Sequence, residues 1–298
     1  MNDPILGSSP GHPILVTGAG GGSQGATGRM VSESLVRAGL PVRAFVHRDD
    51  ARTAELKDLG AEIVVGDLRE VTAVRPAVQG VRRAYFTYPV TAGMLDAAAV
   101  FATSAHEAGV QRVVAVSQLG SDPNAGTPHM RRHWVAEQVL DRAEVGAVHL
   151  RAAVFFDNLR VAIGDRGELA LPLGSPETVL PLIAAADVAA VGAGVLRAEG
   201  PVDPVLWLAG EIMTVGQAAD AFGVPYVPVD PDDYARTAMS IYRDEVTVEH
   251  LTHLWTMFAA IGSGHELFRV TETIEQFTGR PPLTLRDYTG IRPDADPR

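Results

Sequence analysis

The chain has 298 residues, of which 46% are hydrophobic and 20% charged, as is typical of a globular α/β protein with a sizeable core. Its formal net charge of −11 disfavours direct binding to nucleic acid, because a negative surface repels phosphate backbones. It contains no cysteine, which excludes disulfides, zinc–thiolate sites and thiol catalysis.

The first half of the sequence alternates expected strands with expected helices. Residues 1–12 are rich in Gly, Pro and Ser and are expected to form a flexible lead-in. The expected strands are Pro13–Thr17, Val42–Val46, Glu62–Val65, Arg83–Thr87, Arg112–Ser117 and Ala147–Ala152. The expected helices are a segment that ends near Gly39, then Ala51–Leu59, Ala73–Val78, Ala92–Ala108 and His129–Glu144. This alternation predicts βαβ units in a parallel sheet.

The second half is less regular and mostly helical. The segment Leu171–Pro181 contains three prolines and is expected to be a loop over a cleft. Helical patterns cover Ala184–Leu196, Thr214–Phe222, Val246–Phe258 and Val270–Thr278, and a strand is expected at Val205–Leu208. The predicted fold is therefore α/β: a doubly wound parallel Rossmann sheet with a smaller, mostly helical C-terminal substrate lobe. Residues 13–155 would form the nucleotide-binding domain and 156–298 the smaller lobe, partly interleaved with the sheet.

A glycine-rich loop joins the first expected strand to the first expected helix. Gly22, Gly25 and Gly28 have the spacing G-x-x-G-x-x-G. Glycines allow close approach to a pyrophosphate, and the helix N-terminus attracts the anion. A flexible surface loop is the alternative, disfavoured by the strand before it and the helix after it. The expected phosphate contacts are Gly18, Gly22, Gly25, Ala26, Thr27 and Gly28.

The second strand ends at His47 and Arg48, where NAD-selective proteins usually carry an acidic residue. Cationic groups suit a 2′-phosphate, so NADP(H) is expected and NAD(H) disfavoured. The alternative is a solvated basic edge that Asp49 and Asp50 offset.

The carboxyl ends of the later strands carry further candidate cofactor contacts, because ligands bind outside these ends in open α/β sheets. Asp67 is expected at the adenine edge or, alternatively, as a helix N-cap. For each of the other candidates, a loop residue without any ligand contact is an equally good interpretation. The candidates are Asp67, Leu68, Thr87, Tyr88, Pro89, Ser117 and Gln118.

With these segments in place, the chain resembles the NmrA-like branch of the extended, atypical short-chain dehydrogenase/reductase family. The motifs that carry the resemblance run nearly from end to end: Ile14-Leu-Val-Thr-Gly18, Gly25-Ala-Thr-Gly28, Val42-Arg-Ala-Phe-Val46, Gly66-Asp-Leu68, Arg112-Val-Val…Ser117, His133…Glu137-x-x-Leu140, Leu150-Arg-Ala-Ala-Val-Phe-Phe-Asp-Asn-Leu159, Ala186-Asp187-Val188 and Thr278-Gly-Arg-Pro-Pro-Leu-Thr-Leu-Arg-Asp-Tyr288. The resemblance implies a Rossmann domain, NADP(H) binding and a small lobe over the cofactor. It also implies that Phe155, Phe156 and Asn158 approach the nicotinamide.

The sequence departs from the family pattern in three places. The glycine loop is about four residues longer than usual, and His47 stands where the family often has arginine. Counting back from Glu137, His133 and His129 occupy the places of the catalytic lysine and tyrosine of the wider family. Their spacing places them on one helical face.

The two histidines suggest a partial substitute for the missing pair. His133 would bind the nicotinamide ribose, His129 would donate a proton near neutral pH, and Ser117 would hydrogen-bond a substrate carbonyl. The alternative is that both histidines lie on a helix surface or line a cleft without a chemical role. Further candidates for the substrate pocket are Tyr88, Met94, Phe156, Pro172 and Trp255.

Three classes of function fit these observations. The favoured one is an NADPH-dependent reductase of a flat, conjugated quinone, enone or carbonyl substrate; hydride transfer to a quinone needs little help beyond positioning. The other is a non-catalytic NADP(H) sensor that regulates a partner protein, suggested by the missing Tyr–Lys pair. A non-redox isomerase remains a third reading. A cytoplasmic protein with no membrane segment and no metal site is expected, and a homodimer is an open possibility.

Overall fold

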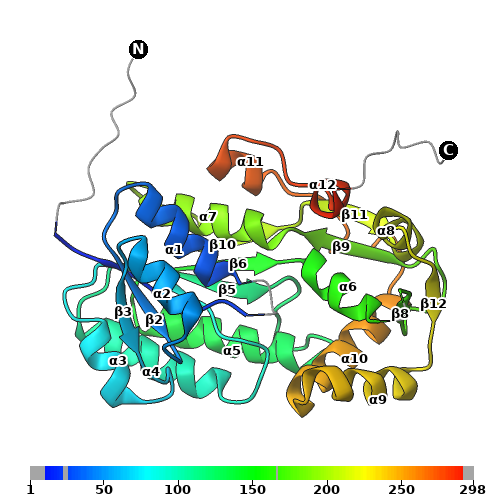
Figure 1. Cartoon of the computed structure of the whole chain (residues 1–298), viewed down its shortest axis with the longest axis horizontal. Coiled ribbons are helices and arrows are strands. Elements are labelled where there is room, and N and C mark those ends of the chain that lie inside the picture. The colour runs from blue at the N-terminus through cyan, green and yellow to red at the C-terminus, as the bar shows by residue number, and fades with distance from the viewer. Residues whose placement is uncertain (1–10, 23–25, 166, 291–298) are drawn as a thin grey trace.

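The computed structural model describes residues 11–22, 26–165 and 167–290. Its centre is a seven-stranded sheet in which every pair of neighbouring strands is parallel (Figure 1). In spatial order the strands are β10 (Val205–Leu208), β6 (Ala147–Ala152), β5 (Arg112–Gln118), β4 (Arg83–Phe86), β1 (Ile14–Val16), β2 (Val42–Val46) and β3 (Glu62–Val65).

Helices cover both faces of this sheet, as Figure 1 shows. One face carries α1 (Thr27–Arg37) and α7 (Ala185–Arg197), with α11 (Thr273–Thr278) packed on α7. The other carries α3 (Val71–Ala77), α4 (Met94–Glu107) and α5 (Pro128–Arg142), and α2 (Ala51–Asp58) lies beside β3. Two separate apolar clusters fill the two interfaces, so the sheet is buried on both sides. The predicted doubly wound Rossmann sheet is confirmed.

The strand order reverses at β1. From β1 the chain builds β2 and β3 on one side, then crosses back to place β4, β5 and β6 on the other. A crevice forms at the carboxyl ends of the strands at such a reversal, and nucleotides bind there in doubly wound folds. The fold therefore places the glycine loop, which follows β1, at the usual ligand-binding position.

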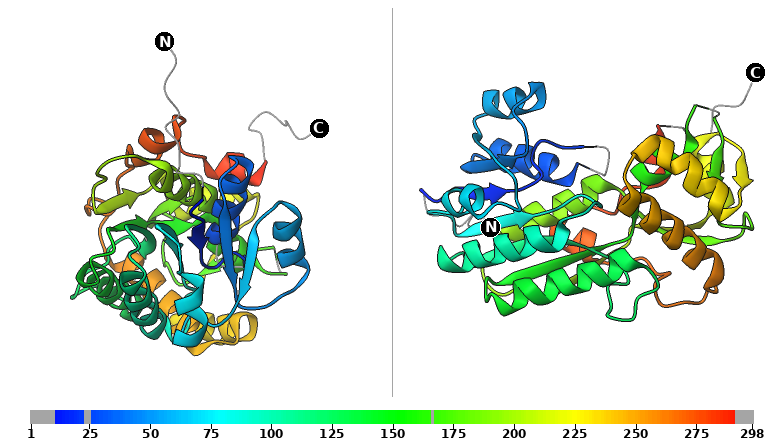
Figure 2. Two further views of the ribbon diagram at one scale, coloured as in Figure 1. Left: turned by 90° about the vertical axis from the view of Figure 1, so that its left-hand side faces the viewer. Right: turned by 90° about the horizontal axis from the view of Figure 1, so that it is seen from below.

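A smaller lobe lies beyond the carboxyl ends of the strands, and its helices α9 and α10 stand apart from the large sheet (Figure 2). It contains a three-stranded sheet in the order β11-β9-β7, a two-stranded sheet of β12 and β8, and its own apolar core. Its elements are β7 (Val154–Phe155), α6 (Phe156–Ile163), β8 (Leu169–Leu171), β9 (Val179–Ile183), β11 (Glu211–Thr214), α8 (Val215–Phe222), β12 (Tyr226–Pro228), α9 (Pro231–Tyr242), α10 (Glu245–Ala260) and α12 (Leu285–Thr289).

The expected loop Leu171–Pro181 is wrong at both ends. Its first residue ends β8, and its last three belong to β9, where the flanking Leu180 and Leu182 are fully buried. Burial of these leucines in the lobe core outweighs the turn preference of the neighbouring prolines.

Asp187 lies inside the first turn of α7, whose N-cap is Ala184. Its buried carboxylate accepts a hydrogen bond from the Leu283 amide (2.8 Å) and pairs with Arg280 (2.6 Å). The pair ties the C-terminal segment to α7.

A cavity at the carboxyl edge of the sheet

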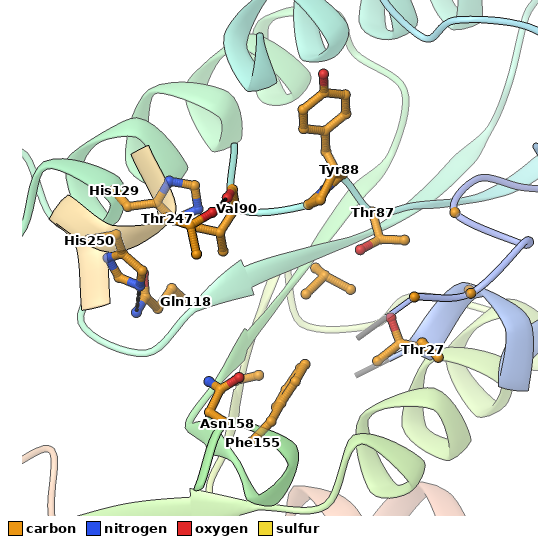
Figure 3. A pocket seen from close by; sticks show the side chains of 18 of the residues that line it. Thr27, Thr87, Tyr88, Val90, Gln118, His129, Phe155, Asn158, Thr247 and His250 are labelled. Atoms are coloured by element: carbon orange, nitrogen blue, oxygen red, sulfur yellow. Dashed lines mark hydrogen bonds between the residues drawn. The ribbon is translucent and has the colours of Figure 1, made fainter. Parts of the chain in front are cut away.

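A cavity of about 450 Å³ opens at the carboxyl ends of β1, β2, β4, β5 and β6 and continues beneath the smaller lobe. Its volume falls within the usual range for small-molecule sites. One end is formed by the glycine loop, the start of α1 and the residues after β2. The other end is formed by side chains of α5 and α10, including His129 and His250, as Figure 3 shows. The cavity is therefore elongated, with chemically different ends.

The end at α1 is suited to a phosphate group. Ala26, the N-cap of α1, adopts a left-handed conformation (φ 47°), and no side chain of the described residues caps this helix. The amides of the first helical turn have no partner within the helix, and they carry its positive dipole end. Ala26, Thr27 and Gly28 all line the cavity. These features fit a dinucleotide pyrophosphate.

Glycine is required where α1 approaches β1. A Cβ on Gly28 would lie 2.3 Å from the backbone oxygen of Thr17, and one on Gly18 (φ +63°) would lie 2.6 Å from Cγ2 of Thr87. Gly22 also lines the cavity but has open space around it. Gly25, the remaining expected phosphate contact, lies outside the described residues.

The cavity wall after β2 carries the basic residues from which a preference for a 2′-phosphate is expected. His47 and Arg48 are exposed and line it. Arg52, which the sequence analysis missed, lines it as well; its guanidinium pairs with Asp50 (2.5 Å) and donates to the Gly21 carbonyl (3.3 Å). Its signal in the sequence was its position just after the capping Asp50, within reach of the end of β2.

Asp67 and Leu68 do not lie on the cavity wall. The Asp67 carboxylate is bound by Arg69 (2.5 Å), whose hydrogen bonds lower the Asp67 pKa to about 2. Leu68 packs against the apolar cluster under α3 and α4, and the N-cap of α3 is Glu70. A local ion pair thus holds the Asp67 carboxylate, and its contact with an adenine stays a prediction.

The middle of the cavity has two facing walls. The segment Thr87–Pro89 follows β4 and lines one side, with the Tyr88 ring turned outwards so that its hydroxyl donates to the Ala92 carbonyl (3.2 Å). Phe155 and Asn158 rise from β7 and α6 on the opposite side (Figure 3). Most of the exposed lining is apolar. Facing walls of this kind suit a flat ring system, which gains from contact on both faces.

Three histidines and a glutamine gather at the end of the cavity that α5 and α10 form. The rings of His129 and His133 lie 4.7 Å apart edge-on, and the rings of His129 and His250 lie 4.8 Å apart. The Nε2 atoms of Gln118 and His250 are 3.3 Å apart. Neither ring nitrogen of His129, nor Nδ1 of His250, nor Oε1 of Gln118 has a partner among the described residues, although all are buried. Buried polar atoms at a cavity wall are free to bind a ligand.

Burial keeps these histidines neutral. Desolvation, aided by the charges of His250 and Arg132, lowers the pKa of His129 to about 3. Desolvation also lowers the pKa of His250 to about 3, with His133, Arg132 and His253 acting in the same direction. The pKa of His133 is well below its usual range, first through burial and then through His129. His129 is therefore expected to be uncharged near neutral pH, and its role as a proton donor stays a prediction that would have to use the neutral ring.

The same shifts predict an acid-sensitive fold. Both His129 and His250 regain their ordinary pKa near 6.5 on unfolding, so the unfolded chain binds more protons than the folded one between that value and about 3. Stability should be fully present above about pH 6.5 and fall as the pH drops, by up to about 2 kcal/mol per histidine at pH 5. Urea unfolding between pH 5 and pH 8 measures this. In the H129Q/H250Q variant the slope should flatten, and an unchanged slope would contradict the assignment.

Ser117 lines the cavity, but its side chain is turned towards α5. Its hydroxyl donates to Oε1 of Glu137 (2.5 Å) and lies 3.1 Å from the Ser121 hydroxyl. Glu137 is also paired with Arg151 (2.6 Å). Ser117 therefore helps to fix a buried ion pair, and the suggested bond to a substrate carbonyl competes with this role.

Four residues expected in the substrate pocket do not line the main cavity, because each of their side chains is buried elsewhere in the protein. Phe156 and Trp255 are fully buried in the core of the smaller lobe, where the Trp255 indole donates to the Tyr234 hydroxyl (3.0 Å). Met94 is in the cluster beneath the large sheet, and Pro172 is buried after β8. Other wall residues were not expected; they are Val90, Thr247, His250, Leu251 and Leu254.

Within the described residues, no group of three or more His, Asp or Glu side chains is arranged to hold a metal ion. No helix in the same part of the chain is long and apolar enough to cross a membrane.

The fold and the cavity together define a dinucleotide-binding Rossmann protein, whose cavity runs from the glycine loop to side chains of α5 and α10. A family model described as NAD(P)H-binding matches residues 22–199, more than half of the chain. The chain belongs to this NAD(P)H-binding family, and the predicted cofactor class is confirmed.

Two relatives that match nearly the whole chain are also NAD(P)H-dependent or other reductases by name. The chain is 28% identical to an NAD(P)H azoreductase of Xenophilus azovorans, over 90% of this chain and 94% of the relative. It is also 28% identical to a (4-alkanoyl-5-oxo-2,5-dihydrofuran-3-yl)methyl phosphate reductase of Streptomyces griseus, over 95% of this chain and 98% of the relative. The fold is similar to that of the Escherichia coli NADPH-dependent quinone oxidoreductase QOR2 in complex with NADPH (TM-score 0.77, 22% identity, 93% of this chain and 98% of the other). These likenesses confirm the predicted family resemblance and agree with an NAD(P)H-dependent oxidoreductase.

Proposed function

We propose that the protein is an NADPH-dependent reductase of flat, conjugated acceptors such as quinones, enones or related carbonyl compounds. The observation that carries the proposal is a single cavity that joins a phosphate-binding helix start to an apolar slot ending in unpartnered neutral polar groups. The slot accepts a planar ring, and the polar end has donors and acceptors for its oxygen atoms. A sensor needs only the cofactor end.

Different residues of the chain would hold different parts of the cofactor and the acceptor. The start of α1 would hold the pyrophosphate, and Arg48 and Arg52 would hold a 2′-phosphate. Phe155 would confine the rings from one side and the segment Thr87–Pro89 from the other. When bound, the nicotinamide supplies a hydride. Gln118 and His129 would bind an acceptor oxygen, and the apolar walls exclude water from the reacting atoms.

The test combines purified protein with NADPH and a panel of quinones, enones and azo compounds, following loss of the reduced-nicotinamide absorbance. Turnover of at least one class is expected. Tight NADPH binding without turnover on any of them would overturn the proposal in favour of the sensor, especially if a partner protein then binds differently with and without cofactor.

The basic adenosine end leads to a separate prediction about cofactor choice. Arg48→Ala should weaken NADPH binding about tenfold, because a charged contact to the 2′-phosphate is lost, and should leave NADH binding nearly unchanged. Fluorescence titration of both cofactors measures this. Arg37→Ala is the matched control: Arg37 is exposed at the other end of α1 and does not line the cavity. If the variant binds NADPH and NADH more weakly by the same factor, Arg48 does not contact the 2′-phosphate.

A further inference from the structure

A stripe of titratable side chains runs along α5 from the cavity to the protein surface. His129, His133, Glu137 and Asp141 follow one another at intervals of four residues, so they share one face of the helix. That face packs on β5 and β6. The first two residues line the main cavity, Glu137 is buried, and the Asp141 side chain is 47% exposed.

A second, very small cavity lies behind the main one. Its volume is about 10 Å³, close to the space that one water molecule needs. Ser117 and His133 line both cavities, so they form part of the wall between them. Glu137 and His149 also line the small cavity. Most of its lining is apolar, and the polar side chains on it, including those of His133 and His149, are the partners that a water there would need.

His149 connects the small cavity to the surface. Its side chain, on β6, is only 2% exposed. Its Nε2 lies 2.8 Å from Oδ1 of Asp141, while its Nδ1 is buried with no partner among the described residues. One nitrogen of this imidazole is bonded to a solvent-exposed carboxylate, and the ring also lines a water-sized cavity. Such an imidazole can accept a proton at one ring nitrogen and release a proton from the other.

We propose that Asp141, His149, a water in the small cavity and His133 form a relay that carries protons from solvent to the substrate end of the main cavity. The inference rests on the proposed reductase function. Reduction of a carbonyl or enone adds one hydride and one proton. The hydride carries both electrons and leaves NADP⁺, and the proton is taken up from solvent at Asp141, so that NADPH, a proton and the acceptor give NADP⁺ and the reduced acceptor.

The neutral state of His133 makes such a supply necessary. A neutral imidazole is a very weak acid, so it gives up a proton readily only as another arrives at its second nitrogen. Successive proton transfers from Asp141 to His149 and on to the water deliver that proton. Glu137 remains paired with Arg151 and fixes the wall of the small cavity rather than carrying the proton itself.

The relay should matter most for acceptors whose reduced form is a strong base. An enolate or alkoxide needs its proton inside the closed cavity, whereas a hydroquinone anion is a weak base that water can protonate after release. His149→Gln and Asp141→Asn keep hydrogen-bonding groups but cannot relay. Both should lower kcat for an enone by about tenfold or more, change quinone turnover little, and leave NADPH affinity unchanged.

Two variants serve as matched controls. His106→Gln alters an exposed histidine at the end of α4 that bonds the Ala143 carbonyl (2.7 Å), and Glu144→Gln removes an exposed charge just beyond α5. Neither should alter turnover of either acceptor. Equal losses on enone and quinone in the His149 and Asp141 variants would show a merely structural role and overturn the relay.

A second measurement does not depend on turnover. With ¹⁵N-histidine-labelled protein saturated with NADP⁺, the exchange rate of the His133 ring N–H with solvent should fall in both relay variants and stay unchanged in the controls. If no acceptor is reduced but exchange slows, the reductase proposal fails and the relay stands. If exchange in the relay variants matches the wild type, protons reach His133 by another route and the relay is wrong.

Discussion

Gly28→Ala is expected to destabilise the fold by about 1–3 kcal/mol and to weaken NADPH binding at least about tenfold. The added Cβ would lie 2.3 Å from the Thr17 oxygen and 2.8 Å from backbone atoms of Gly18. Because these atoms are backbone, they cannot rotate away, and the start of α1 must move from β1. The amides that would hold the pyrophosphate move with it. Urea unfolding and fluorescence titration with NADPH measure the two effects.

Gly22→Ala is the matched control for the stability effect. Gly22 lies in the same loop, but a Cβ there meets nothing within 4 Å and its φ lies outside the left-handed range. Its free energy of unfolding should stay within about 0.5 kcal/mol of the wild type. If Gly28→Ala is as stable as Gly22→Ala, the close contact between α1 and β1 does not limit this position.

The Rossmann half was predictable because its signals are local. Val42–Val46, Glu62–Val65 and Ala147–Ala152 are short apolar runs between turn residues, and the structure has strands with these same bounds. The smaller lobe has no such regularity. β7, β8 and β12 have two or three residues each and pair with strands distant in the sequence, so their burial depends on contacts that no local pattern reveals.

In the candidate site too, only the features with a local sequence signal were predictable. The spacing of His129 and His133 predicted that they share a face, and the structure brings their rings together. His250 joins them from α10, and no local signal in the sequence links it to them. Phe155 and Phe156 are adjacent, yet the first lines the cavity and the second is fully buried in the lobe core. Sequence shows that a residue is apolar, but not whether its neighbours leave a cavity beside it.

Arg151→Met is expected to cost about 3–5 kcal/mol of stability, since it leaves the buried Glu137 carboxylate without its cation. Arg151 donates to both oxygens of Glu137 (3.0 and 2.6 Å), and its guanidinium also stacks on the Trp207 ring at 5.5 Å. Urea unfolding measures the loss. Arg142→Met, a change of the same kind at an exposed arginine on α5, should alter stability by no more than about 0.5 kcal/mol.

A double variant separates the lost charge from lost packing. E137Q/R151M buries a neutral amide instead of an unpaired carboxylate, so it should be more stable than R151M alone. If both variants lose the same stability, packing of the arginine stem and its stacking on Trp207 account for the effect rather than the ion pair.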